Sequence, residues 1–382
     1  MNDNKSACPL YSILLVCYNN YELIFEAIDS ILFQTYSNIE LIISDDGSAV
    51  FNADEIACYI EGKKRDNISR IVINENDKNI GTVRHLEKLR AISKGEFIHA
   101  LAADDAFYDE FAVETLAKEF ERLGSEALII TSETIIYDRN LKNSLHSWVS
   151  PIEKFILARA DAKEQFDTLA YRCIVNTPST CVRRKIYDVV DMRLDKYTLL
   201  EDRPFFSRVT RIGIPIYFVD RPTVKYRSGG VSEVGKKVFS TSHAEFLKDK
   251  VTFIDFEVLP YRETLKRESV MSAIRVRDEA LDRLLELPRS MVPKGIRRQL
   301  ALKKLENYSY RYSAKKISGA LCLFSSLFLL VGLNYFDTDF YYFQTIGFFF
   351  IVLGLLCFVA TGFVVFMKIT IKSLVYFRWR RL

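Results

Sequence analysis

Adjacent carboxylates at three places in the sequence could do chemistry: Asp104 with Asp105, Asp45 with Asp46, and Glu201 with Asp202. The first pair directly follows a short apolar run and two alanines in the stretch GEFIHALAADD. Two carboxylates about 4 Å apart repel each other by roughly 4 kcal/mol at an effective dielectric constant near 20. A divalent cation, Mg²⁺ or Mn²⁺, offsets this repulsion, because it is typically held by one or two carboxylates plus substrate phosphates. We therefore expect Asp104 and Asp105 to bind a metal ion, and a helix N-cap is the alternative.

The two other acidic pairs have different surroundings. SDDGS at 44–48 places Asp45 on a turn after a strand, where one carboxylate could accept a hydrogen bond from a pyrimidine ring N–H. The alternative there is turn chemistry around Gly47. Glu201 and Asp202 precede Arg203 and Pro204, and taken alone this pattern indicates the acidic first turn of a helix.

Short apolar runs and helical patterns must position these groups. Strands are expected at 11–17, 40–44, 68–74, 96–101, 127–131 and 214–219, and helices near 24–32, 83–92, 111–123 and 162–171. Buried strands that alternate with helices indicate an α/β fold with a mainly parallel sheet sandwiched by helices. Ligands of such sheets bind beyond the carboxyl ends of the strands, where the sequences YNN, SDDGS and AADD fall. Neither Gly-x-Gly-x-x-Gly nor a P-loop occurs, so these two phosphate-binding motifs are excluded.

Composition narrows the class of protein further. A net charge of +4 gives no argument for nucleic acid as a partner. Seven cysteines without a Cys-x-x-Cys pair indicate reduced thiols in the cytosol, and four histidines have no zinc-ligand spacing.

The C-terminal part predicts a membrane anchor. Residues 317–336 and 340–367 are free of charged side chains, and runs of 20 and 28 residues can each cross a hydrocarbon core of about 30 Å. Basic residues flank both runs on their outer sides, which predicts a hairpin with both ends and the large N-terminal part in the cytoplasm, at a bacterial inner membrane. We thus expect a catalytic domain at 1–240, a helical basic linker at 241–316, transmembrane helices within 317–367, and a basic tail at 368–382. The linker either contacts membrane lipids or is an ordinary solvated helix packed on the domain.

Several motifs in order resemble the family 2 glycosyltransferases, which have an A-type, nucleotide-diphospho-sugar transferase fold. The resemblance covers about residues 10–232 and rests on four stretches: VCYNNYELIFEAIDSILFQTYSNIELIISDDGS, NIGTVRHLEKLRAISKGEFIHALAADDAFYD, NTPSTCVRRKIYD and EDRPFF. It implies transfer of a sugar from a nucleoside-diphosphate donor with inversion at the anomeric carbon.

The resemblance also implies roles for single residues. Those expected at the donor are Tyr18, Asn19 and Arg84 beside the nucleotide, Asp45 at the base, Asp104 at the ribose and diphosphate, and Asp104 with Asp105 at the metal. Asp202, next to Glu201, falls where the family has its general base, which takes the proton of the attacking hydroxyl.

Three departures from the family pattern matter. Ala102 stands where Asp-x-Asp-Asp often begins, which puts contact with the ribose in doubt. YRSGGVS at 226–232 lacks the histidine often found there, so no histidine is assigned to the metal or the phosphates. The Gln-x-x-Arg-Trp motif of processive synthases is absent, which favours a single transfer for each encounter.

The sequence therefore predicts a membrane-anchored enzyme that moves one sugar to a glycan acceptor, lipid-linked, in the assembly of a bacterial surface polysaccharide such as O-antigen or capsule. A polyprenyl-phosphate glycosyltransferase is the closest alternative, although AADDAFYDE replaces the metal-site signature usual in that group. A non-catalytic nucleotide-sugar-binding membrane protein is the alternative from another class, with Ala102 in its favour.

Overall fold

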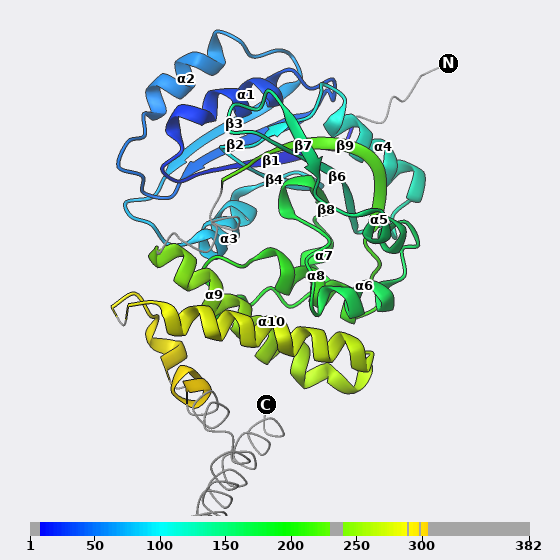
Figure 1. The fold of residues 1–382 in the computed structure, drawn as a ribbon. Helices are drawn as coiled ribbons and strands as arrows, with labels where there is room; N and C mark the ends of the chain where they lie inside the picture. The colour runs from blue at the N-terminus through cyan, green and yellow to red at the C-terminus, as the bar shows by residue number, and fades with distance from the viewer. Residues whose placement is uncertain (1–7, 230–239, 289, 298, 305–382) are drawn as a thin grey trace, which may run out of the picture. The chain divides into compact units, whose positions relative to one another are not determined.

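A computed structural model describes residues 8–229, 240–288, 290–297 and 299–304. The chain divides into two compact units, of which the first comprises Met1–Ala280 with Leu287–Met291 and the second Leu281–Glu286 with Val292–Leu382. All candidate site residues belong to the first unit, which carries the sheet and the helices around it (Figure 1).

Four parallel strands form the N-terminal half of the sheet, as the sequence predicts. They are β1 (Tyr11–Cys17), β2 (Ile39–Asp45), β3 (Ile68–Glu75) and β4 (Phe97–Ala102), in the spatial order β3-β2-β1-β4. Nearly every side chain of β1 and β2 is buried, as expected for central strands covered on both faces. The register pairs Cys17 with Asp45 and Val16 with Ala102, so these three strands end at the same edge.

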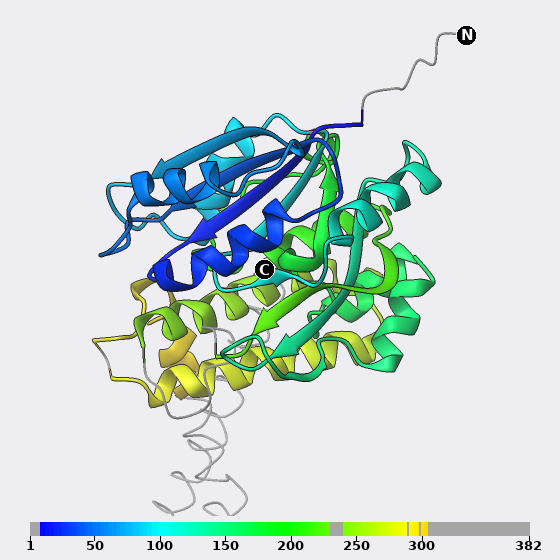
Figure 2. The ribbon, with the colours of Figure 1, turned by 90° about the horizontal axis from the view of Figure 1, so that it is seen from above.

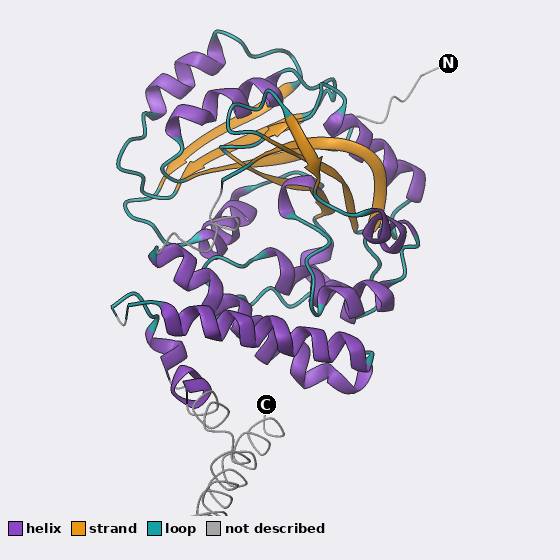
Figure 3. Cartoon of the chain, viewed as in Figure 1, coloured by secondary structure: helices purple, strands orange, loops and turns teal. Residues whose placement is uncertain are grey.

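Helices cover both faces of this half (Figure 3). One face packs against α1 (Ile24–Leu32), α2 (Ala53–Glu61) and α4 (Ala112–Leu123), whose apolar sides join a core that includes Ile28, Ile56 and Phe120. The other face packs against α3 (Thr82–Ile92), α7 (Ile186–Val189) and α8 (Asp202–Arg211), in a second core. The predicted sandwich is confirmed.

The other half of the sheet is mixed, and here the prediction of a mainly parallel sheet is wrong. Its strands are β5 (Ala106–Phe107), β6 (Ile129–Tyr137), β7 (Ser144–Ser147), β8 (Thr180–Arg183) and β9 (Tyr217–Arg227). Strand β8 pairs antiparallel with both β4 and β6, and β9 runs parallel to β6 but antiparallel to β5 (Figure 2). The prediction failed because β8 was not expected as a strand, although it lies between β4 and β6.

Strand β9 is also longer than the predicted run at 214–219. It continues through Pro222 to Arg227, and its register against β6 shifts around Glu133. Such irregularities accommodate a proline, which has no N–H for the ladder. The extension matters because it carries the strand to the loop that holds Asp104 and Asp105.

Helices α5 (Pro151–Ala158) and α6 (Ala162–Leu169) lie between β7 and β8. After β9, in line with the predicted helical character of 241–316, the chain forms α9 (Thr241–Phe253), a π-helical turn η3 (Ile254–Val258), a 3₁₀ turn η4 (Leu259–Thr264) and α10 (Arg267–Glu286), whose last six residues belong to the second unit. Within the described ranges, no helix has both the length and the apolar character needed to cross a bilayer. The predicted hairpin within 317–367 and the tail at 368–382 lie outside the described residues.

Candidate active site

At the ends of β1, β2 and β4, two of the predicted acidic residues, Asp45 and Asp104, lie near the thiol of Cys17. Cys17 is the last residue of β1, its carbonyl accepts the N–H of Asp46 at 2.9 Å, and the carbonyl of Val16 accepts the N–H of Ala103 at 2.8 Å. Burial raises the pKa of the Cys17 thiol to about 12, and the charges of Asp45 and Asp104 contribute to this rise. Asp45 and Asp104 therefore lie on the two sides of β1, at one edge of the sheet.

Asp45 holds the turn that follows β2. Its Oδ2 accepts the N–H of Ser48 at 2.6 Å, and its Oδ1 accepts the hydroxyl of the same serine. The hydroxyl of Ser48 in turn accepts the N–H of Asn19 at 2.7 Å, which joins the loop after β1 to the loop after β2. The neighbouring Tyr18 exposes 46% of its surface, so its ring is accessible to a planar ligand. A contact of Asp45 with a base stays a prediction, since both of its oxygens already serve the turn.

Asp46, the second acid of this pair, is a structural anchor. Its buried carboxylate accepts the side-chain N–H of Asn76 at 2.9 Å and the backbone N–H groups of Ile80 and Gly81 at 3.0 Å each. Gly81 precedes the first turn of α3. Asp46 thus fixes the start of α3 against the end of β2.

Asp104 and Asp105 have separate tasks. Asp105 is buried, and its Oδ1 accepts the backbone N–H of Arg227 at 2.9 Å. The backbone carbonyl of Asp104 accepts the Nε–H of Arg227 at 2.6 Å. Burial raises the pKa of the Asp104 carboxyl, and the charge of Arg227 opposes that shift.

The different contacts of Asp104 and Asp105 determine how well each carboxylate could bind a metal ion. A Mg²⁺ or Mn²⁺ ion bound together with substrate phosphates needs one or two protein carboxylates. Within the described ranges, no group of three or more His, Cys, Asp or Glu side chains could enclose a metal. Asp104 fits such a role better, because among the described residues its carboxylate forms a hydrogen bond only with its own backbone, whereas Asp105 is bound to the backbone of β9.

Glu201 and Asp202 lie at the start of α8, as the sequence predicts. Asp202 is the first residue of the helix, and its carboxylate accepts the N–H of Arg203 at 2.5 Å. Glu201 accepts the hydroxyl of Thr177 at 3.0 Å. Burial and the adjacent charge of Asp202 raise the pKa of Glu201 to about 7, and burial also raises the pKa of Asp202. Because two neighbouring carboxylates resist joint ionisation, the pair is suited to exchange one proton near neutral pH.

Comparison with known proteins identifies the chemistry of this fold. A sequence profile of the family described as "Glycosyl transferase family 2" matches residues 12–189. That range contains all of β1 to β4 except Tyr11, and both acidic loops at the strand ends. Residues 12–189 form a family 2 glycosyltransferase domain.

Two bacterial relatives of this glycosyltransferase are described as uncharacterized glycosyltransferases. One glycosyltransferase of Haemophilus influenzae is 28% identical over 231 residues, which cover 58% of this chain and 67% of that protein. Another, of Rickettsia felis, is 26% identical over 241 residues, which cover 62% of this chain and only 37% of the relative. The structure of S. aureus TarS 1–349 in complex with UDP-GlcNAc is similar with a TM-score of 0.46 and 14% identity, covering 79% of this chain and 92% of that chain.

Arg227 lies at the candidate site, and the sequence alone assigns it no role. Its side chain is buried and forms an ion pair with Glu26 on α1, and it also donates to the carbonyls of Asp104 and Arg139. Arg227 therefore joins the loop of Asp104 and Asp105 to α1 and to the loop after β6. A single arginine at the end of a strand carries no sequence signal for such a role, since its partners lie far away along the chain.

The predicted donor residues of the glycosyltransferase do not all converge. Tyr18, Asn19, Asp45 and Asp104 follow strands that end at one edge of the sheet. Arg84 lies on the exposed side of α3 and forms no hydrogen bond or ion pair within the described residues, so a nucleotide contact by Arg84 stays a prediction. The chain before Asp202 contacts the start of α3, because the carbonyl of Thr198 accepts the N–H of Val83 at 3.4 Å. Convergence of Asp202 with the donor residues stays a prediction.

Proposed function

We propose that this glycosyltransferase moves a single sugar from a nucleoside-diphosphate donor to a glycan acceptor, with inversion at the anomeric carbon. The observation that carries the proposal is the placement of Asp45 and Asp104 on the two sides of Cys17, at the carboxyl ends of adjacent parallel strands within a family 2 domain. This is the edge at which open α/β sheets bind nucleotides. Tyr18 and Asn19 stand on the same edge and would contact the base.

Asp202 serves as the general base in this proposal. The acceptor hydroxyl loses its proton to the Asp202 carboxylate while its oxygen attacks the anomeric carbon, and the bond from that carbon to the diphosphate oxygen breaks. The N–H of Arg203 stabilises the ionised form of Asp202. A divalent cation bound by Asp104 would neutralise the charge that develops on the departing diphosphate. Asp105 and Arg227 hold the Asp104 loop in place.

The proposed acceptor is a lipid-linked glycan of a bacterial surface polysaccharide, at the cytoplasmic face of the inner membrane. The two uncharged runs within 317–367 support this part, because a membrane anchor would confine the enzyme to the plane in which such acceptors lie. The adjoining basic residues would favour contact with anionic lipids.

A donor screen tests the proposal. Full-length protein in detergent or membranes is incubated with labelled nucleotide sugars, lipid-linked glycan acceptors, and Mg²⁺ or Mn²⁺. We expect transfer from one donor, loss of transfer with EDTA, and a loss of at least about 100-fold in kcat for Asp202→Asn. Equal transfer by the wild type and Asp202→Asn would exclude Asp202 as the base. Transfer to polyprenyl phosphate alone would instead identify the alternative acceptor class.

A further inference from the structure

Asp249, on α9, accepts several hydrogen bonds from segment 198–200, which directly precedes the proposed acidic pair. Its side chain is fully buried, and its Oδ2 accepts three successive backbone N–H groups, from Thr198 at 2.8 Å, Leu199 at 2.7 Å and Leu200 at 3.1 Å. Glu201 and Asp202 follow directly. Hydrogen bonds to an ionised acceptor are stronger than those between neutral groups, and three of them on one oxygen fix the backbone of segment 198–200.

The negative charge of Asp249 has a local partner. Nζ of Lys248 lies 3.2 Å from its Oδ1 and 2.8 Å from Oε2 of Glu245, and it also donates to the hydroxyl of Thr198 at 3.1 Å. A buried carboxylate without such compensation would be costly. Since Lys248 also binds Thr198, the compensation itself adds a contact to segment 198–200.

Segment 198–200 also touches the donor side of the domain. The carbonyl of Thr198 accepts the N–H of Val83, and it would lie 3.1 Å from a Cβ atom at Gly81, so the two chains are in close contact. Gly81 donates to Asp46 at the end of β2. Asp249, Thr198 and α3 thus form one continuous path from α9 to the sheet edge.

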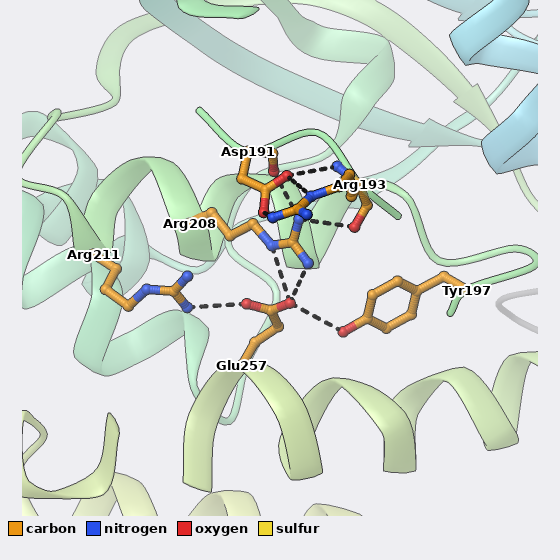
Figure 4. A network of polar contacts seen from close by, with 6 residues as sticks. All are labelled: Asp191, Arg193, Tyr197, Arg208, Arg211 and Glu257. Atoms are coloured by element: carbon orange, nitrogen blue, oxygen red, sulfur yellow. Dashed lines mark hydrogen bonds and ion pairs between the residues drawn. The ribbon is translucent and has the colours of Figure 1, made fainter. Parts of the chain in front are cut away.

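A second buried acid holds the other half of α8. Glu257, in the π-helical turn η3, pairs with Arg208 at 2.5 Å and with Arg211 at 3.0 Å, and it accepts the Tyr197 hydroxyl at 3.5 Å (Figure 4). Arg208 also donates to the carbonyls of Asp191 and Arg193. The continuous stretch 245–257 therefore forms hydrogen bonds and ion pairs both with the chain immediately before α8 and with α8 itself.

From this arrangement we propose that Asp249 is a positioning residue for the transfer reaction. It sets the position of Asp202 relative to the donor edge through segment 198–200, while Glu257 fixes the direction of α8. The inference rests on the proposed function of Asp202. Residues 241–258 lie outside the range matched by the family profile, so the proposal assigns a catalytic contribution to a helix beyond that range.

The test compares Asp249→Asn and Asp249→Ala with a matched control, Asp255→Asn. Asp255 is also buried and lies six residues farther along the same helical stretch, but it pairs with Arg277 of α10 at 2.6 Å. Among the described residues, no hydrogen bond joins Asp255 to segment 198–200. A displacement of about 1 Å at a catalytic group can cost on the order of 100-fold in rate. We expect kcat to fall by about tenfold to 100-fold, less in Asp249→Asn than in Asp249→Ala. The donor KM should stay within about twofold of wild type. Asp255→Asn should keep the wild-type kcat even where its Tm falls.

Hydrogen exchange provides a readout that does not depend on activity. In Asp249→Asn, the amides of 198–200 should exchange at least about tenfold faster, while peptides from β1 and β4 keep their wild-type protection. Unchanged exchange at 198–200, or faster exchange with a wild-type kcat, would overturn the proposal. If Asp249→Ala does not fold, Asp249→Asn decides.

The failure of this proposal can be told apart from the failure of the proposed function. If the wild-type protein transfers no sugar from any donor, or if Asp202→Asn is fully active, the function or the base assignment is wrong whatever Asp249 does. If the wild type is active and Asp202→Asn is not, the kcat of Asp249→Asn tests positioning alone.

Discussion

The carboxylate of Asp105 accepts the backbone N–H of Arg227 at 2.9 Å, across 122 positions of the chain. This bond separates two adjacent aspartates into a buried anchor and a second residue, Asp104, whose carboxylate is available to a ligand. A carboxylate pair that looks symmetrical in the sequence is therefore asymmetric in the fold.

Substitution of Asp104 should reduce activity without loss of stability, whereas substitution of Asp105 should reduce stability. Asp104→Asn should leave the Tm close to that of wild type and reduce transfer by at least about 100-fold, because it removes the proposed metal ligand. Asp105→Ala should lower the free energy of unfolding by about 1–3 kcal/mol, because the N–H of Arg227 loses its buried partner. Chemical denaturation and a transfer assay at several Mn²⁺ concentrations measure both. A stable, fully active Asp104→Asn protein would contradict the metal assignment.

As pH rises through neutrality, the transfer activity should increase while the free energy of unfolding decreases. Burial raises the pKa of Glu201 to about 7, and activity should rise as pH increases through that value, because the acidic pair must lose a proton before Asp202 can act as a base. A carboxyl whose pKa is raised by folding stabilises the native state below its unfolded pKa, and this contribution is lost as pH rises through the folded pKa.

The stability part can be measured between pH 4.5 and 7.5. The free energy of unfolding should decline less steeply over this range in Glu201→Gln than in wild type, and the activity profile of this variant should shift to lower pH, because the neighbouring charge is gone. Glu263→Gln, at an exposed position on η4, serves as the control. Superimposable profiles for wild type and Glu201→Gln would show that Glu201 does not titrate in this window.

Arg227 should be irreplaceable by lysine. Lys keeps the positive charge but cannot donate to Asp104, Arg139 and Glu26 together, because it lacks the planar fork of donors. Arg227→Lys should raise the Mn²⁺ concentration needed for half-maximal activity by about tenfold, since the Asp104 loop loses its support. Arg221→Lys, at a half-exposed site on the same strand, should not change it. The measurement is a metal titration of the transfer rate.

The turn after β2 should tolerate no side chain at Gly47. Gly47 has φ near +73°, and a Cβ atom there would lie 2.5 Å from the backbone of Lys78. Gly124 has a similar φ of +81°, but a Cβ atom there meets nothing within 4 Å. Gly124→Ala therefore measures the conformational strain without a clash, of about 1–3 kcal/mol, whereas Gly47→Ala should lose a comparable amount plus the cost of the clash. Equal losses in urea denaturation would show that the loop of Lys78 moves aside freely.

The sequence was most informative where a signal is local. Strands such as β1, with YSILLVC, and helices such as α4 have apolar periodicity within one window, so their bounds were predicted closely. The acidic pairs were visible for the same reason. Their separate tasks were not, because the partners of Asp46, Asp105 and Asp249 are backbone N–H groups located 34 to 122 residues away, and every residue type except proline has such a group. Strand β8 was missed because TCVR is too short to show a period.

Strand β9 has a practical consequence for work with shortened forms of the protein. It pairs with β6 along eight register positions, from Ile130 with Tyr217 to Tyr137 with Arg227. A fragment that ended near residue 189, where the family profile stops, would leave this side of β6 without its hydrogen-bonding neighbour. Unpaired strand edges recruit other chains. Such a fragment would be expected to precipitate during expression, and soluble preparations would need to retain at least β9 and the helix that precedes it.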